Sequence, residues 1–514
     1  MSDTTEVVED IPCELTRIVD EHREDKTSYP QTADVEAIVA LLPAGGAVGP
    51  EFCRVFGAAL TCISRNQDLI QDVIDAGAIP ALMQTATLHS GSASVVESLN
   101  ALINISRTPV GVYNIVTCGV PYVVVSLLSI FRTEQSICVP CLTLICRMCS
   151  IKEALAAMMS KRLIQELVEM AEANRNDAEF LLYIFETART ICRTGQKAAK
   201  EVTQGGLIEA ALRAMADFPD NVKVTAQSLV LLVSVCLFPK LARAVAPRGA
   251  EDVALAVLAA DRDDATLTSE RTEALRLAAI LLMVIAAGGR WLAKSVIAKG
   301  AVPLLCSAMT SPDAVLVTSS ADALVAIMTA VPKRLTPIEL LDGAEDGWRS
   351  PVRYALTYLS DPAHRGTEDF CKPCASLAYF LSAALVSKDV VELVLEEGGL
   401  QTVCDLLQMG AVQGDVLCAD ACLLLYADLY PHCSDEEERL TAVASALPAC
   451  EAITKEHRAQ PMIQASVAKA EAVCGKLSKD SPKVFLMSGL VLCGCLVVAG
   501  TISRVIDIIK MEAP

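Results

Sequence analysis

Cysteine pairs are the residues of this chain whose types and spacing could do chemistry. Of 21 cysteines, Cys138 and Cys141 form one C-x-x-C pair, and Cys146 and Cys149 form a second, four residues later. Four thiols that converge on one point could bind zinc, which takes a tetrahedral set of ligands. The segment reads as one helix, however, and a continuous helix cannot bring all four thiols to one ion. We therefore expect these cysteines to pack as small apolar side chains.

A third pair, Cys371 and Cys374, lies in a segment where the sequence pattern is broken. Such a pair can serve as a redox dithiol or as half of a metal site. No matching second pair stands near it in the sequence, so the sequence predicts no metal ion here and no cofactor.

Catalytic patterns are missing from the rest of the sequence. The five histidines are isolated from one another, and no HExxH, GxSxG or P-loop pattern occurs. We therefore do not expect an enzyme or a small-molecule substrate. The histidines are His22, His89, His364, His432 and His457.

Composition favours closely packed helices. Of the 514 residues, 53% are hydrophobic but only 4% are aromatic, and the mean hydropathy is +0.43. Runs that alternate with period two are scarce, which argues against a large sheet. The net charge of −19 disfavours nucleic acid and favours proteins as partners, with basic or helical segments among them. The acidic N-terminus resembles no signal peptide, so we expect reduced thiols and a body that faces the cytosol.

One phrase recurs along the chain. It consists of a short amphipathic helix, a glycine and a second apolar helix that often starts with proline, as at 68–83, 112–127 and 293–308. Glycine accepts the left-handed conformation at a helix end, and proline fits a first helical turn. From Gly77 to Gly119 is 42 residues, and similar steps reach Lys161, Gly205 and Gly249, followed by longer steps to Gly300 and Gly398. A period in the low forties predicts a helical solenoid.

At AGAIPALM (76–83) and SLNALINIS (98–106) the sequence resembles the second and third helices of an armadillo repeat. This resemblance implies an all-α fold, an armadillo/HEAT-like right-handed α-solenoid superhelix, over 35–478, with an irregular insertion at about 331–372. Residues 1–34 are then an acidic leader or a capping helix. The resemblance also implies a groove, lined by third helices, that binds proteins. It leaves open whether the weaker repeats are armadillo or HEAT-like.

The groove of armadillo proteins that bind import cargo carries a ladder of Trp and Asn. Here one residue, Asn104, matches the Asn position, and the Trp positions hold other residues, so we do not expect import-cargo binding. If the groove functions, its floor carries Asn100, Asn104, Arg147, Glu186 and Thr190. The alternative for each of them is a solvated helix face.

Residues 484–502 predict a transmembrane tail anchor, followed by a short polar tail at 503–514. The 19 residues carry no charge, and as a helix they span roughly 28 Å, close to the hydrocarbon thickness of a bilayer. The membrane that holds this anchor would be the mitochondrial outer membrane or that of the endoplasmic reticulum. Its apolar residues are Val484, Phe485, Leu486, Leu490, Val491, Leu496, Val497, Val498 and Ile502.

We therefore expect a membrane-tethered armadillo-type scaffold or adaptor that binds partner proteins through its solenoid surface. The alternative is a soluble cytosolic adaptor or chaperone cofactor whose last helix caps the solenoid.

Overall fold

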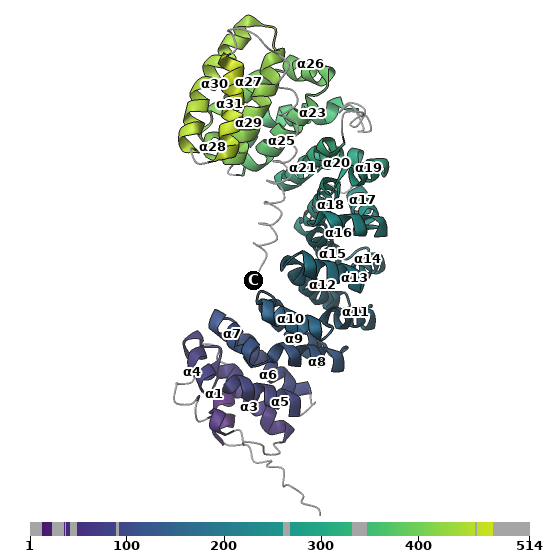
Figure 1. Ribbon diagram of the computed structural model, residues 1–514, viewed down its shortest axis with the longest axis vertical. Helices are drawn as coiled ribbons and strands as arrows, with labels where there is room; N and C mark the ends of the chain where they lie inside the picture. Colours follow the sequence, from purple (N-terminus) through teal and green to yellow (C-terminus); the bar gives the residue numbers. More distant parts are fainter. Residues whose placement is uncertain are drawn as a thin grey trace, which may run out of the picture. The chain divides into compact units, whose positions relative to one another are not determined.

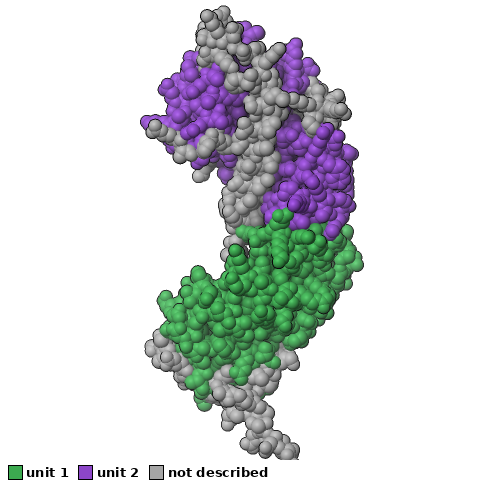
Figure 2. Space-filling view, in the orientation of Figure 1, with its two compact units in different colours: residues 1–231 green, residues 232–514 purple. Residues whose placement is uncertain are grey.

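The structure is a computed structural model that describes residues 13–22, 35, 38–41, 49–88, 92–260, 268–331, 347–367, 369–457 and 460–475. Every regular element in these ranges is a helix. The chain divides into two units, Met1–Leu231 and Leu232–Pro514, which Figure 2 shows in green and purple. The boundary falls within helix α15, Val222–Cys236.

Unit 1 consists of short helices that recur in groups of three (Figure 1). After the leading helix α1 (Cys13–His22), they are α3 (Pro50–Ile63), η1 (Gln67–Leu69), α4 (Ile70–Asp75), α5 (Ala78–Leu88), α6 (Ser92–Ile105), α7 (Pro109–Thr117), α8 (Val120–Ile130), α9 (Gln135–Met148), α10 (Lys152–Ser160), α11 (Leu163–Ala173), α12 (Ala178–Arg193), α13 (Gln196–Gly205) and α14 (Leu207–Asp217).

Unit 2 continues the same pattern of short helices. Its helices are α16 (Pro239–Val245), η2 (Ala246–Arg248), α17 (Ala250–Ala260), α18 (Ser269–Ala287), α19 (Arg290–Ala298), α20 (Ala301–Met309), α21 (Ala314–Ala330), α23 (Arg349–Ser360), α24 (Pro362–Arg365), α25 (Cys371–Ala384), α26 (Lys388–Glu396), α27 (Gly399–Gln408), α28 (Gly410–Gly414), α29 (Val416–Leu429), η3 (Tyr430–His432), α30 (Glu436–Glu456) and α31 (Pro461–Gly475).

Third helices form the central row of each unit. In unit 1, α3, α6, α9 and α12 each pack on the next, and in unit 2 the same holds for α18, α21, α25, α29 and α31 (Figure 1). Large buried aromatic side chains lie on these helices, among them Phe56, Phe180 and Phe380. Small residues allow close approach: a Cβ at Gly57 of α3 would lie 3.0 Å from the backbone nitrogen of Ser98 in α6. The core therefore runs along the third helices, where burial of apolar surface stabilises the stack.

Residues with positive φ mark the turn between the first and second helices. Gly77, Gly119, Gly249, Gly300 and Gly398 have φ between 74° and 106°, as the sequence predicts. Two predicted positions are wrong by one residue. The left-handed residue is Gly206 rather than Gly205, because α13 extends through Gly205.

The other correction falls in the degenerate repeat. Here Arg162, with φ of 65°, holds the left-handed position that the sequence places at Lys161. Arg162 is the one non-glycine residue with positive φ among those that the structure describes. The corrected steps from Gly119 to Arg162, Gly206 and Gly249 are 43, 44 and 43 residues.

Hydrogen bonds between neighbouring repeats report the same period. Asn174 Nδ2 donates to the carbonyl oxygen of Arg132, 42 residues earlier, at 2.9 Å. Arg175 pairs with Asp217, also 42 residues away, with Nε 2.6 Å from Oδ2. In unit 2, Ser295 Oγ donates to Glu251 Oε2, 44 residues away, at 2.7 Å. Each bond joins neighbouring repeats at a separation close to the predicted period, in agreement with a helical repeat.

Two segments that the sequence sets apart from the regular repeats, the leader or cap at 1–34 and the insertion at about 331–372, contain helices. Within 1–34, α1 packs on α3 and buries Leu15 and Ile18 fully, as a capping helix would. Within 331–372, α23 and α24 form before α25, and α23 packs on α26 and α27. Residues 332–346 lie outside the described residues.

The predicted membrane anchor, 484–502, and the polar tail, 503–514, also lie outside the described residues. Within the described ranges, no individual helix combines the length and the apolar composition that a bilayer crossing needs. Two bent pairs, α7 with α8 and α19 with α20, satisfy those criteria jointly, with angles of 75° and 81° between their helices.

Candidate protein-interaction face

The exposed edges of α6, α9 and α12 carry rows of equivalent residues at a step of 43. One row consists of Asn100, Thr143 and Glu186, which occupy the same place on three consecutive third helices. All three side chains are half-buried, so each retains a surface open to solvent. Of these, Asn100 and Glu186 were predicted as groove-floor residues. The structure places them two repeats apart in one row.

The next row lies one helical turn further along and consists of Asn104, Arg147 and Thr190. Asn104 is 7% exposed, and its Nδ2 donates to the carbonyl oxygen of Thr61 at 3.1 Å. Thr190 Oγ1 donates to the carbonyl oxygen of Glu186, one turn earlier in α12, at 3.0 Å. The amide of Asn104 therefore joins α6 to α3, and the hydroxyl of Thr190 bonds within its own helix.

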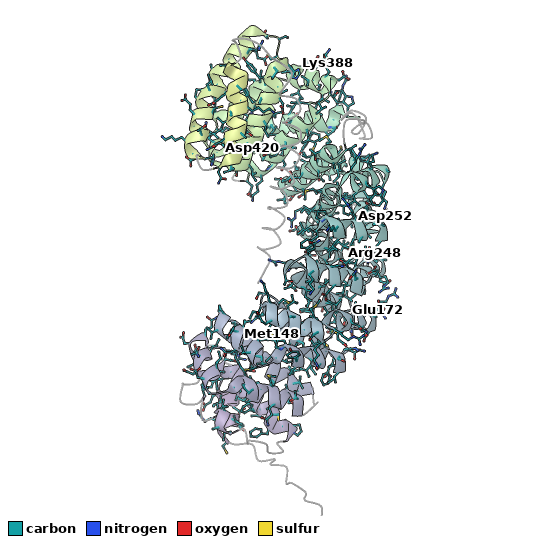
Figure 3. The ribbon with its side chains drawn as sticks, viewed as in Figure 1. Met148, Glu172, Arg248, Asp252, Lys388 and Asp420 are labelled. Carbon is teal, nitrogen blue, oxygen red and sulfur yellow. The ribbon has the colours of Figure 1, made fainter. Side chains whose placement is uncertain are left out.

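Arg147 joins α9 to α6 in the same manner. Its Nη1 donates to the carbonyl oxygen of Ile103 at 2.7 Å and to Ser106 Oγ at 2.8 Å. Its side chain is half-buried, and Met148, which follows it in the chain, is labelled in Figure 3. Partial burial, followed by the repulsion of the Arg107 guanidinium, lowers the pKa of Arg147.

Positive charge gathers where the third helices end. Arg107 and Arg193 are exposed at equivalent positions of two repeats. The repeat between them has the exposed Ser150 at the same position. Carbonyl groups at a helix C-terminus favour such charges. Within the described part of the chain, neither Arg107 nor Arg147 forms an ion pair with a carboxylate. Two neighbouring guanidinium groups without a counter-charge favour an anionic partner.

An apolar row borders the polar row on its other side. Val96, Val139 and Leu182 are equivalent and half-buried on α6, α9 and α12. Tyr183, next to Leu182, is 43% exposed. The face therefore presents apolar, polar and basic rows in parallel, each of which crosses the three helices.

The four cysteines at 138–149 lie on or directly after the single helix α9, as predicted. Cys138, Cys141 and Cys149 are buried, and Cys146 Sγ donates to Thr187 Oγ1 of α12 at 3.5 Å. Burial raises the pKa of Cys138 to about 12, which leaves this thiol protonated at neutral pH. These thiols pack between third helices and do not converge.

The pair Cys371 and Cys374 has a second pair beside it, contrary to the sequence interpretation. Cys418 and Cys422 lie on α29, which packs on α25, and hydrogen bonds from Cys374 and Cys418 lower the pKa of Cys422. The two pairs are more than 40 residues apart in the sequence. The signal that could have found them is the repeat period, because residues one repeat apart lie side by side in a solenoid.

Comparison with known proteins shows the fold. No protein-family model matches the chain, and no curated protein matches it either. An engineered protein whose crystal structure was solved by the Northeast Structural Genomics Consortium aligns with 81% of this chain and 98% of its own, with a TM-score of 0.63 and 19% identity. A designed armadillo repeat protein aligns with 49% of this chain and 99% of its own, with a TM-score of 0.40 and 13% identity. The first likeness confirms that the chain is an all-helical repeat solenoid.

Proposed function

We propose that this protein is a scaffold that binds a partner protein on the face formed by α6, α9 and α12. The observation that supports this function is the set of parallel rows, because a step of 43 residues repeats the same position on three neighbouring helices. Solenoids use such extended surfaces to bind partners. The proposed role is binding without catalysis.

The spacing of the rows suggests an extended segment as the ligand. Packed helices lie roughly 8–10 Å apart, and an extended chain advances about 3.4 Å per residue. A strand that crosses the three helices above the polar row would therefore meet a new helix at about every third residue. Its side chains would alternate, one set toward Val96 and Val139 and the other toward Arg107 and Arg147. The partner segment would thus alternate apolar and acidic residues.

This partner differs from the basic segment that the net charge of −19 favours. The long-range field of the whole chain attracts cations, whereas recognition in contact depends on the groups that line the face. Arg107 and Arg147 at the face oppose the overall charge, so a binding measurement separates the two possibilities.

The test is fluorescence anisotropy with two labelled peptides of about ten residues, a length that spans the three helices. In the acidic peptide, Glu residues alternate with Leu or Ser residues. In the basic peptide, Lys replaces every Glu. The matched variants are Arg107→Glu on the face and Lys200→Glu on α13, which make the same change in charge at exposed positions. We expect the acidic peptide to bind wild type and to lose about tenfold in affinity with Arg107→Glu but little with Lys200→Glu. Tighter binding of the basic peptide, or equal losses in the two variants, would contradict the proposed face.

We also propose that residues 484–502 anchor this scaffold in a membrane with its body in the cytosol. The support is the sequence itself, which has no charge over a span that matches a bilayer. Alkaline carbonate extraction of cells that express the full chain or a version ending at Lys483 tests the proposal. The full chain should stay with the membranes and the shortened chain should be released. Release of both would favour the soluble adaptor.

A further inference from the structure

Two cysteine pairs from consecutive third helices meet in unit 2. Cys371 and Cys374 lie three residues apart in the first turn of α25, and Cys418 and Cys422 lie four residues apart on α29. Spacings of three and four place both members of a pair on one helix face. Since α25 and α29 pack directly on each other, the two pairs face one interface.

The sulfur atoms converge. Cys374, Cys418 and Cys422 place their Sγ atoms within 4.8 Å of one another, and all three residues are buried. The thiol of Cys371, which lies beside this group, donates to the carbonyl oxygen of Ala411 at 3.4 Å, and its interaction with Cys418 raises the pKa of Cys371. Four thiolates around one zinc ion, each about 2.3 Å from the metal, stand roughly 3.8 Å apart. The separations of Cys374, Cys418 and Cys422 allow that arrangement, and the Cys371 thiol would leave the carbonyl oxygen of Ala411 to complete it.

Cysteine also serves as a packing residue in other third helices, with two in α3 and three in α9, whereas α18 and α21 contain none. The convergence of the thiols on α25 and α29 is what distinguishes this cluster. In each pair the residues also share a face, whereas the thiols of α9 do not converge. Four thiols at one contact match the composition of a structural zinc site.

We propose that Cys371, Cys374, Cys418 and Cys422 bind one zinc ion that joins α25 to α29. The thiols lose their protons to solvent on binding, and the four thiolates then coordinate the metal. The backbone N–H groups in the first turn of α25 offset part of the resulting negative charge. Cys371 is half-buried, so it gives the ion a route from solvent to the three buried thiols. The inference does not depend on the proposed protein-binding face.

The first experiment adds Co²⁺ to the reduced, purified full chain. One equivalent should produce the thiolate-to-cobalt charge-transfer band and the strong visible bands of a tetrahedral site, and Zn²⁺ should remove both. Native protein should contain about one zinc per chain by elemental analysis, and chelation should lower its Tm by about 5 °C. Absence of the cobalt bands in the folded protein would overturn the proposal.

Three variants locate the site. Cys371→Ser changes the half-buried ligand, so the protein should keep its fold while the cobalt charge-transfer band weakens. Cys418→Ser with Cys422→Ser should abolish the band. Cys138→Ser with Cys141→Ser is the matched control, because it removes two buried thiols from α9, and it should leave one equivalent of cobalt bound. Unchanged cobalt bands in Cys371→Ser and in the Cys418/Cys422 variant, or their loss in the control, would overturn the assignment.

Discussion

Tyr379 Oη donates to Asp420 Oδ2 at 2.5 Å, and both residues are buried. The other oxygen of the same carboxylate, Oδ1, accepts a hydrogen bond from Ser466 Oγ at 2.6 Å. One carboxylate on α29 therefore bonds to α25 on one side and to α31 on the other; Figure 3 labels Asp420. Two donors compensate for the cost of burying this polar group.

The same arrangement recurs two helical turns further along α29. Asp428 Oδ2 accepts from Ser382 Oγ of α25 at 2.6 Å, and Oδ1 accepts from Lys469 Nζ of α31 at 2.7 Å. The three helices are thus tied at two levels, and loss of one donor should weaken a contact between repeats.

Tyr379→Phe should lower the free energy of unfolding by about 1.5–3 kcal/mol, because it removes a donor to a buried carboxylate and keeps the ring. Urea unfolding followed by circular dichroism measures this change. The control is Tyr183→Phe, where the side chain is 43% exposed. It should change stability by less than about 0.5 kcal/mol. Similar losses in the two variants would show that the Asp420 contact contributes nothing specific.

The raised pKa of Asp420 should make the free energy of unfolding depend on pH in a direction that can be measured. Burial raises the pKa of Asp420 above its usual value, and the bonds from Ser466 and Tyr379 counter this only in part. The folded state therefore binds more protons than the unfolded state, in which the pKa is about 3.9. Stability conferred by this group falls as the pH rises through the window between the two values. The difference in stability between wild type and Asp420→Asn should shrink from about pH 4 upward.

Asp217 supplies a control of the opposite sign. Its bond to Arg175 lowers the pKa of Asp217, so its contribution is present above the unfolded value and is lost as the pH falls through the folded one. The difference between wild type and Asp217→Asn should therefore grow as the pH rises. Urea titrations across the acid range measure both slopes, and slopes of one sign for the two variants would contradict the assignment.

A glycine should improve the one repeat that lacks it at the turn. Arg162 holds φ of 65°, a conformation that costs an L-residue roughly 1–2 kcal/mol. Arg162→Gly should therefore stabilise unit 1 by about 1 kcal/mol, after the extra freedom of glycine in the unfolded chain is counted.

The reciprocal change provides the control. Gly119 has φ of 85°, and a Cβ there would meet no atom within 4 Å. Gly119→Arg should therefore destabilise through the backbone alone, by about the same amount that Arg162→Gly gains. Thermal unfolding of the two variants measures whether each change raises or lowers the stability. A loss of stability in Arg162→Gly would mean that the Arg162 side chain, which bonds to Gln165, matters more than its backbone strain.

Much of the fold could be predicted from the sequence because the residues that end one helix and begin the next are adjacent in the chain. A glycine followed by an apolar helix specifies a turn wherever it stands, so Gly77, Gly119 and Gly300 place their repeats. In the degenerate repeat no glycine is present, and the left-handed residue falls on Arg162 instead of Lys161. Without a glycine, the local sequence gives no signal that separates Lys161 from Arg162 as the turn residue between α10 and α11.

The candidate face was harder to predict because exposure depends on neighbouring repeats. Asn100 and Asn104 are identical in type and lie one turn apart on α6. Asn104 is 7% exposed and bonds to α3, whereas Asn100 remains half-buried. Likewise, Cys371 and Cys418 come together only because α25 packs on α29. Contacts between repeats determine both the exposure of the asparagines and the proximity of the cysteines. The sequence of a single helix contains no information on either.

The two asparagines give a direct test of this distinction. Asn104→Ala should lower the free energy of unfolding by about 1 kcal/mol, because it removes the bond to the carbonyl oxygen of Thr61. Asn100→Ala should change stability by less than about 0.5 kcal/mol. If unfolding shows the reverse order, Asn104 does not serve as the joint between α3 and α6.

Apart from the contacts of the cysteine thiols on α25 and α29, the hydrogen bonds between repeats described above join residues 41 to 46 positions apart, such as Tyr379 with Asp420 and Ser466 with Asp420. None of these bonds joins repeats that are distant in the sequence. Pulled from its ends, such a chain should yield a series of small force steps rather than one large rupture. Each released repeat of about 43 residues would add roughly 150 Å of contour length. A solenoid of this design would unfold gradually under load and could recover its length repeat by repeat.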